Sequence, residues 1–221
     1  CPEIERHIST QANNTNYGTF LFWYKQGAKR VVTARELSLK EIREIREHIP
    51  EDMEIESFIH GAMCISYSGR CLLSNFLTGR DANQGACTHP CRWKYAVAEE
   101  TRPGEWMPVY ENERGSYIFN SRDLCMIDHI PEMVEAGIDS FKIEGRMKSP
   151  RYTAGVVSIY RKYVDLYLKE GRAGYHVEKA DRDALLALFD RGGQSQGYYH
   201  THNGRDMVVL KEKPEYRDVD Q

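Results

Sequence analysis

Residues 30–61 read RVVTARELSLKEIREIREHIPEDMEIESFIHG and alternate between a strand pattern and a helix pattern. The first seven residues favour a strand, and residues 53–60 predict a second strand that places Glu56 and His60 on one face. Between them, Ser38 and Glu41 have the S-x-x-E spacing of a capping box, which predicts the start of a helix. A strand–helix–strand run of this kind predicts two parallel strands joined by a crossover helix.

The same alternation continues on both sides of this stretch. We expect further strands at residues 5–11 and 138–145, and helices at 16–26, 131–136, 152–170 and 181–190. Four βα units in one direction predict an α/β fold that forms part of a TIM-like barrel, because an entire barrel needs about 250 residues. An open doubly wound sheet is the alternative. The chain begins at Cys1 without a methionine, and we interpret it as a fragment.

The expected domain organisation follows from these elements. Residues 1–171 form the partial barrel and contain a cysteine-rich insertion at about 79–120. Within the insertion, residues 102–105 read RPGE and predict a turn between two antiparallel strands. Residues 172–221 supply a short C-terminal extension, with one helix and a Gly-rich tail.

The composition is that of a soluble globular protein, with 41% hydrophobic and 29% charged residues. The formal net charge of -3 excludes a nucleic-acid binder that works by bulk positive charge, although a local basic face is compatible with it. The sequence has no run of about 18 apolar residues and no secretory pattern at its N-terminus. We therefore expect a cytoplasmic protein that does not cross a membrane.

Five of the six cysteines lie between residues 64 and 125, with gaps of six, fifteen, three and thirty-three residues. Only the pair Cys87 and Cys91 has the spacing of a zinc knuckle, and Lys94 occupies the third cysteine position of a radical S-adenosylmethionine motif. Buried apolar cysteines are one interpretation of the set. Four thiolates that converge in space can also hold an iron–sulfur cluster. A nucleophilic Cys64 assisted by His60 is a further alternative, but no established hydrolase motif accompanies the pair.

Three stretches together resemble the signature of a known family: residues 56–74 (ESFIHGAMCISYSGRCLLS), 80–93 (RDANQGACTHPCRW) and 141–152 (FKIEGRMKSPRY). They resemble the collagenase-like peptidases, the peptidases of unknown catalytic type numbered thirty-two. The resemblance also includes residues 7–12 and 32–38, so it spans nearly the whole chain. Its most similar branch implies a prephenate-dependent hydroxylase that acts on the wobble uridine of tRNA. Sister branches hydroxylate a ribosomal RNA cytidine or the ubiquinone ring, and the family label implies a peptidase as the alternative.

The resemblance also implies cofactors and partners. It implies a 4Fe–4S cluster held by Cys64, Cys71, Cys87 and Cys125, with Cys91 as an alternative to Cys87. Prephenate is the expected co-substrate and the anticodon region of tRNA the expected macromolecular partner; the sequence identifies no protein partner.

Polar residues at the expected strand ends supply the other candidates for the site. The substrate-binding set is Gln11, Arg35, Glu36, Lys142 and Arg146, and the catalytic set is His60, Glu56 and Glu144. Prephenate carries two carboxylates, which the three cations of the first set are suited to bind. The glutamates would pair with these cations in the empty site, and His60 would transfer a proton. A charged network that only fills the barrel interior is the structural alternative. For RNA, the basic run from Lys142 to Arg151 and the mixed basic and aromatic run at residues 92–95 are the candidate contacts.

Overall fold

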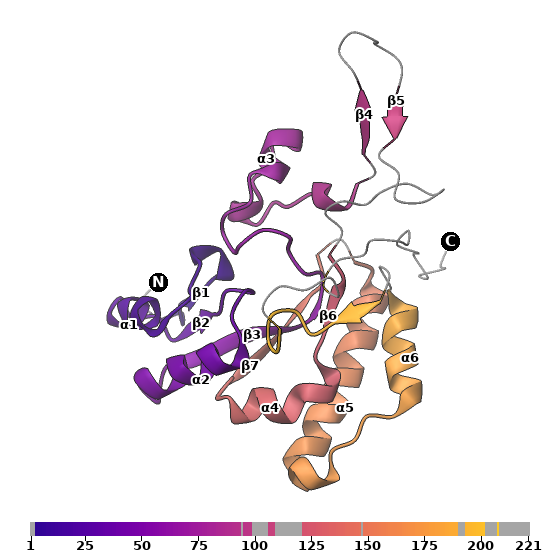
Figure 1. Cartoon of the computed structure of the whole chain (residues 1–221). Helices are drawn as coiled ribbons and strands as arrows, with labels where there is room; N and C mark the ends of the chain where they lie inside the picture. Colours follow the sequence, from indigo (N-terminus) through magenta and orange to yellow (C-terminus); the bar gives the residue numbers. More distant parts are fainter. Residues whose placement is uncertain are drawn as a thin grey trace.

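A computed structural model describes residues 3–93, 95–98, 106–108, 121–146, 148–189, 193–201 and residue 207. It is a mixed α/β fold with a six-stranded sheet and a separate two-stranded hairpin (Figure 1). No helix among these residues is both long enough and apolar enough to cross a bilayer.

The first half of the sheet is built from the predicted βα units. Strands β1 (His7–Ile8), β2 (Arg30–Val32) and β3 (Glu54–Gly61) are parallel neighbours, joined by helices α1 (Tyr17–Lys25) and α2 (Leu39–His48). The predicted capping box is present at the start of α2, where both of its hydrogen bonds form. The first strand is shorter than predicted, because the 3-10 helix η1 (Thr10–Ala12) replaces its second half.

The sheet beyond β3 differs from the predicted parallel barrel. Strand β7 (Ser140–Glu144) pairs parallel with one edge of β3. On the opposite edge of β3, β2 pairs with its first residues and β6 (Asp123–Cys125) pairs antiparallel with its last two. Strand β8 (Gln194–Ser195) continues the sheet from β6. The described strands therefore form a mixed sheet, and the barrel is not confirmed.

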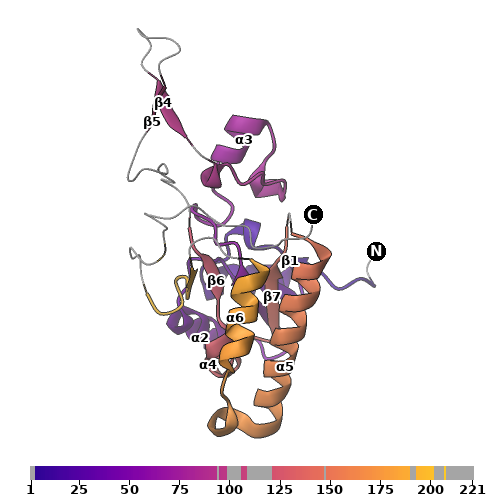
Figure 2. The ribbon, with the colours of Figure 1, turned by 90° about the vertical axis from the view of Figure 1, so that its right-hand side faces the viewer.

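Three helices pack beside the second half of the sheet (Figures 1 and 2). They are α4 (Ile130–Glu135), which follows the 3-10 helix η4 (Ile127–His129), α5 (Pro150–Gly174) and α6 (Lys179–Leu188). Gly171 has a φ of 68° and interrupts α5 at the predicted end of the helix. Tyr152, Val156, Tyr160 and Tyr163 of α5 are buried in the main hydrophobic core.

The cysteine-rich segment, which we define as residues 64–93, lies above the end of the sheet, on the side away from α4 (Figures 1 and 2). It contains α3 (Leu73–Thr78) and the 3-10 helices η2 (Ala82–Gln84) and η3 (Pro90–Arg92). Strands β4 (Ala96–Ala98) and β5 (Trp106–Pro108) pair antiparallel, as expected for the insertion. The turn predicted at residues 102–105 lies outside the described residues.

Candidate functional site

A hollow of about 660 Å³, which includes its open mouth, separates the end of β3 from the cysteine-rich segment. Four cysteines line it: Cys64, Cys71, Cys87 and Cys91. The polar side chains around them are those of Gln11, Arg35, Ser68, Asn83, His89, Arg92, Glu144 and Arg146. Residues from five separate parts of the chain thus meet at one place.

Gly69 and Gln11 fix the first wall of this hollow. The Gly69 amide donates to Gln11 Oε1 at 3.1 Å, and Gln11 Nε2 donates to the Ala82 carbonyl at 3.0 Å. Gly69 has a φ of +70°, and a Cβ there would lie 2.2 Å from the Gln11 carbonyl oxygen. Only glycine allows this close approach without strain. Both ends of the Gln11 amide are engaged, so this residue positions the cysteine segment.

Ser68 joins the same wall to the ends of β1 and β2. Its hydroxyl accepts from Thr10 Oγ1 at 3.2 Å and from the Arg35 amide at 3.1 Å. Glu36 Oε2 accepts from the Ser68 amide at 3.3 Å, and Glu36 Oε1 accepts from Asn13 at 2.8 Å. The predicted substrate residue Glu36 is therefore also occupied in holding the loop that follows Cys64.

Asn83 and Arg92 hold the second wall. The Asn83 side chain accepts from the Cys71 amide and donates to the Cys71 carbonyl, both at 2.9 Å. Arg92 Nη2 donates to the Met63 carbonyl at 2.7 Å, and Arg92 Nη1 lies 3.5 Å from Asp123 Oδ1. Arg92 and Asp123 are both more than nine-tenths buried, so this pair attaches the segment around Cys91 to the end of β3 and the start of β6.

The thiols in the hollow are influenced by burial and by arginines. Burial raises the pKa of Cys64, and the nearby Arg35 opposes that shift. Burial raises the pKa of Cys91 to about 11, with Arg92 opposing. Both thiols are therefore protonated near neutral pH until a metal displaces the proton.

Four thiols around one hollow can hold a metal centre, and their spacing bears on its kind. Among the described residues, no three of these sulfurs lie within 4.8 Å of one another, so they do not form a ready site for a single ion. Four thiols around one hollow are a donor set that an iron–sulfur cluster accepts.

Cys125 does not lie with the other four cysteines. It is the last residue of β6, pairs with His60 of β3, and has its sulfur 3.7 Å from the Tyr160 hydroxyl. Burial raises the pKa of its thiol. Of the ligand set that the family resemblance implies, the structure groups Cys64, Cys71 and Cys87, and it adds Cys91 where the resemblance gives Cys125.

Three of the predicted charged residues do meet in the hollow. Arg35 Nη2 lies 3.4 Å from Glu144 Oε2, while Glu144 Oε1 accepts from the Arg146 amide at 2.9 Å. The Arg35 guanidinium also lies over the Phe58 ring, 4.1 Å from its centre. Within the described part of the chain, the buried Arg35 Nε has no hydrogen-bond partner. Arg92 also lines the hollow but is paired with the buried Asp123, so Arg35 and Arg146 against Glu144 leave a formal excess of one positive charge, which suits an anionic ligand.

The remaining predicted residues lie outside the hollow. Lys142 Nζ is 3.1 Å from Glu56 Oε1, and Glu56 also binds Ser140 and Arg30 nearer the start of the strands. Although burial acts against it, these partners lower the pKa of Glu56. Glu56 and Lys142 thus belong to a charged network with Arg30 and Ser140, which lies outside the hollow and nearer the start of the strands.

His60 faces a different side of the sheet from the predicted one. The pairing of β3 with β7 skips Ile59, so this β-bulge moves His60 off the face that carries Phe58. The His60 ring packs near Tyr152 and contacts the Tyr160 hydroxyl at 3.2 Å. Burial, with a contribution from Lys148, lowers its pKa to about 3, so it is neutral at physiological pH. The predicted face is wrong at His60, and the ring is not close enough to the hollow to line it.

Sequence reasoning gave no role to Asn83 or His89, which both line the hollow. Burial lowers the pKa of His89 to about 4, and neighbouring cations add to the shift. His89 lies between the two cysteines of the knuckle-like pair, and that position is the signal that could have identified it.

The predicted RNA-binding runs divide into buried and exposed residues. Arg92 is buried and Lys148 lies against the Phe189 ring, so neither is a surface contact for RNA. Lys94 lies outside the described residues. Three aromatic side chains of the cysteine-rich segment are exposed: Tyr67 (67%), Phe76 (86%) and Trp93 (44%). Each of these exposed rings is available to stack with a base.

Comparison with known proteins gives a consistent family assignment. The model of peptidase family U32 matches residues 1–208. A tRNA hydroxylation protein of Bacillus subtilis is 46% identical over 198 residues, which cover 86% of this chain and 46% of that protein. The tRNA hydroxylation protein P of Escherichia coli is 40% identical over 243 residues, covering 91% of this chain and 52% of that protein. An uncharacterised protease of Methanocaldococcus jannaschii is 47% identical over 202 residues, covering 89% of this chain and 47% of that protein.

The chain spans about half the length of these curated relatives. No solved structure gives a significant match to it.

Proposed function

This chain belongs to peptidase family U32, and from that membership and the cysteine-lined hollow we propose that it is part of an RNA hydroxylase acting on the wobble uridine of tRNA. The observation that carries the proposal is one hollow that contains four thiols and three arginines. The thiols are suited to a redox centre, and the arginines are suited to an anionic co-substrate. Relatives in the same family are named as tRNA hydroxylation proteins.

The proposed redox centre is a 4Fe–4S cluster. Cys64, Cys71 and Cys87 are its ligands both by family resemblance and by position in the hollow. Two residues compete for the fourth position: Cys91, which lines the hollow, and Cys125, which the resemblance implies. When bound, the cluster would supply one-electron chemistry beside the arginines.

The proposed co-substrate is prephenate, a dicarboxylate. Arg35 lines the hollow with a buried Nε that has no hydrogen-bond partner among the described residues, and Arg146 is exposed at the same hollow, so each arginine can take one carboxylate. Glu144 orients both, because it contacts the Arg35 side chain and the Arg146 backbone. Gln11, Glu36 and Asn83 act by holding the walls in place.

The proposed RNA contact is the exposed aromatic surface of Tyr67, Phe76 and Trp93. Of these three rings Tyr67 lines the hollow, so a base stacked on Tyr67 would lie near its mouth. The relatives named for tRNA hydroxylation favour tRNA as the RNA. The ribosomal RNA and ubiquinone branches are outcomes that the experiment below must distinguish.

Peptidase activity is the second candidate by family label alone. A cysteine nucleophile would need an adjacent base. His60 contacts Tyr160 and does not line the hollow with Cys64. Among the described residues, the predicted pair of Cys64 and His60 is therefore not formed. His89 does line the hollow beside the cysteines, so the preference for the hydroxylase rests on the relatives named for tRNA hydroxylation.

The first experiment measures iron and sulfide per chain, and visible absorbance, after purification without oxygen. We expect a coloured protein with about four irons per chain. Cys91→Ser and Cys125→Ser are matched variants, and the one that loses iron and colour identifies the fourth ligand. A colourless, iron-free wild type would exclude the cluster.

The second experiment uses mass spectrometry of RNA from a strain that lacks the full-length protein. We expect the hydroxylated wobble uridine to disappear from tRNA and to return with the wild-type gene but not with Cys87→Ser. Unchanged tRNA with loss of ribosomal hydroxycytidine, or of hydroxylated quinone, would move the protein to a sister branch.

A further inference from the structure

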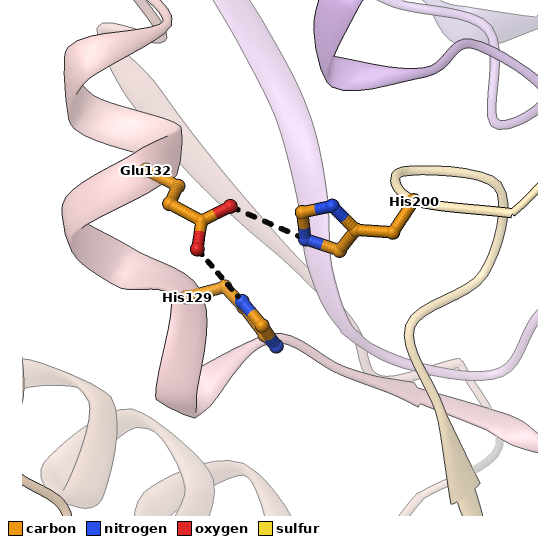
Figure 3. Close-up of side chains that lie close together, drawn as sticks. All are labelled: His129, Glu132 and His200. Atoms are coloured by element: carbon orange, nitrogen blue, oxygen red, sulfur yellow. Dashed lines mark hydrogen bonds and ion pairs between the residues drawn. The ribbon is translucent and has the colours of Figure 1, made fainter.

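A second group of ligand-type side chains lies away from the cysteine hollow. His129, Glu132 and His200 place one ligand atom each within 4.8 Å of one another. Figure 3 shows the Glu132 carboxylate between the two imidazole rings. Its Oε1 lies 3.3 Å from His129 Nδ1, and its Oε2 lies 3.4 Å from His200 Nε2 (Figure 3).

We propose that these three side chains form a binding site for one divalent transition-metal ion of the zinc class. Two imidazoles and one carboxylate are a ligand set that zinc accepts, with the fourth position left open. In a tetrahedral site with metal–ligand distances of about 2.0–2.2 Å, the ligand atoms stand about 3.3–3.6 Å apart. The two observed separations of 3.3 and 3.4 Å have this length. A small rotation of the carboxylate would direct one or both of its oxygens at the ion.

The backbone holds the three ligands in position before any metal binds. His129 immediately precedes α4 and Glu132 lies in its first turn, so their spacing of three residues puts them on one side of the helix. His200 follows Tyr199, which is buried and whose hydroxyl donates to the Phe58 carbonyl. The Tyr199 carbonyl accepts from the Leu39 amide at 3.2 Å. The loop that presents His200 is thus attached to both β3 and α2.

Gln196 supplies the second contact that a metal-binding imidazole usually has. Its amide nitrogen lies 2.7 Å from His129 Nε2, the ring nitrogen that does not face Glu132. If Nδ1 binds a metal, Nε2 carries the proton and needs an acceptor, which the amide oxygen provides after a half-turn of the amide. The residue that follows β8 therefore fits the outer position of a metal site.

The open coordination position has room beside it. Glu132 and His200 line an open hollow of about 1120 Å³, which includes its mouth, together with α2 residues and with Tyr198 and Tyr199. The α2 residues include Lys40 and Arg43, which oppose a cation, and Glu41 and Glu44, which offset them. A water or a small anionic ligand can complete the coordination from this side.

Cobalt is the probe that separates this site from the cysteines. Cobalt bound by nitrogen and oxygen absorbs weakly in the visible, whereas cobalt bound by thiolates adds strong near-ultraviolet charge-transfer bands. We expect the wild-type chain, titrated with Co²⁺ without oxygen, to show one binding event that lacks the thiolate bands and is reversed by Zn²⁺. Glu132→Gln and His200→Ala should weaken this event by more than about a hundredfold, and Gln196→Leu by about ten- to a hundredfold.

The controls decide between a metal site and a simple hydrogen-bonded group. His176→Ala removes an exposed histidine whose Nδ1 contacts the Gly174 carbonyl, and it should leave the cobalt affinity unchanged. Circular dichroism establishes that each variant is folded, and Glu132→Gln keeps the size and polarity of the ligand. Equal cobalt binding by wild type, Glu132→Gln and His200→Ala would overturn the proposal. Loss of the binding event in Cys87→Ser would also overturn the proposal, because that result would assign the ion to the cysteine hollow. A wild type without an iron–sulfur cluster would leave the proposal for this metal site unaffected.

Discussion

Replacement of Arg35 by methionine should weaken prephenate binding by about tenfold or more while the chain stays folded. Arg35 lines the hollow, and among the described residues its buried Nε has no hydrogen-bond partner, while Nη2 contacts Glu144 at 3.4 Å. Loss of one charge-assisted hydrogen bond costs about 1.5–3 kcal/mol, which corresponds to a roughly tenfold to 150-fold higher Kd. The free energy of unfolding should fall by only about 2 kcal/mol, less than for a fully buried ion pair, because Glu144 keeps its bond from the Arg146 amide. Methionine retains much of the packing over Phe58.

Isothermal titration calorimetry of prephenate against chain purified without oxygen measures the first quantity, and urea unfolding measures the second. Arg35→Lys keeps the charge but lacks the Nε donor, so it should bind with intermediate affinity. Arg70→Met is the matched control, since Arg70 is exposed and lines only the neighbouring hollow. The reasoning is refuted if Arg35→Met binds prephenate as tightly as the wild type. It is equally refuted if Arg70→Met weakens binding to the same extent, because the effect would then be one of overall charge.

Three further predictions concern the scaffold of the site. Tyr160→Phe should lower the free energy of unfolding in urea by about 1–3 kcal/mol, because His60 Nδ1 loses the Tyr160 hydroxyl as its partner. The Met126 amide and the Ile59 carbonyl also contact this hydroxyl, but they still bond to each other in the variant. An unchanged free energy of unfolding would contradict this prediction. Because burial lowers the folded pKa of His60 to about 3, the unfolded chain binds this proton more readily, and stability should fall with pH from about 6.5 towards 3. This one group contributes up to about 1.4 kcal/mol per pH unit, so His60→Gln should show a shallower loss in acid-unfolding curves, and an equal slope would exclude the assignment. Gly69→Ala should destabilise more than Gly79→Ala, since both glycines have a φ near 70° but only the Cβ at residue 69 would strike a backbone oxygen, that of Gln11; equal midpoints of thermal unfolding would argue against that contact.

The first half of the sheet could be predicted because its signals are local. The capping residues Ser38 and Glu41 and the apolar spacing between them and residue 60 define each element before any tertiary contact. Strands β6 and β8 could not be predicted in this way, because they are three and two residues long and carry no measurable period. Their pairing depends on β3, to which β6 is added antiparallel.

The same distinction between local and distant signals applies to the residues of the site. Arg35, Lys142 and Arg146 were predicted to converge at the ends of parallel strands. Arg35 and Arg146 do line one hollow, together with Glu144, whereas Lys142 pairs with Glu56 outside it. The face of His60 was missed because one extra residue at Ile59 reverses the alternation, and a single bulge leaves no trace in the hydrophobic pattern. The grouping of Cys91 with Cys64 depends on Arg92, whose buried contacts join residues far apart in the sequence.

Strand β6 links the cysteine hollow to the proposed metal site. Asp123 at its start pairs with Arg92 of the cysteine-rich segment, and its chain continues directly through η4 to His129. Its neighbour β8 leads to Gln196 and His200. A change in β6 should therefore disturb both sites, whereas a change in one ligand should disturb only its own. For that reason the single cysteine variants and the single His200 variant, each measured for iron content and for cobalt binding, separate the two centres. Substitutions in the sheet could not do so.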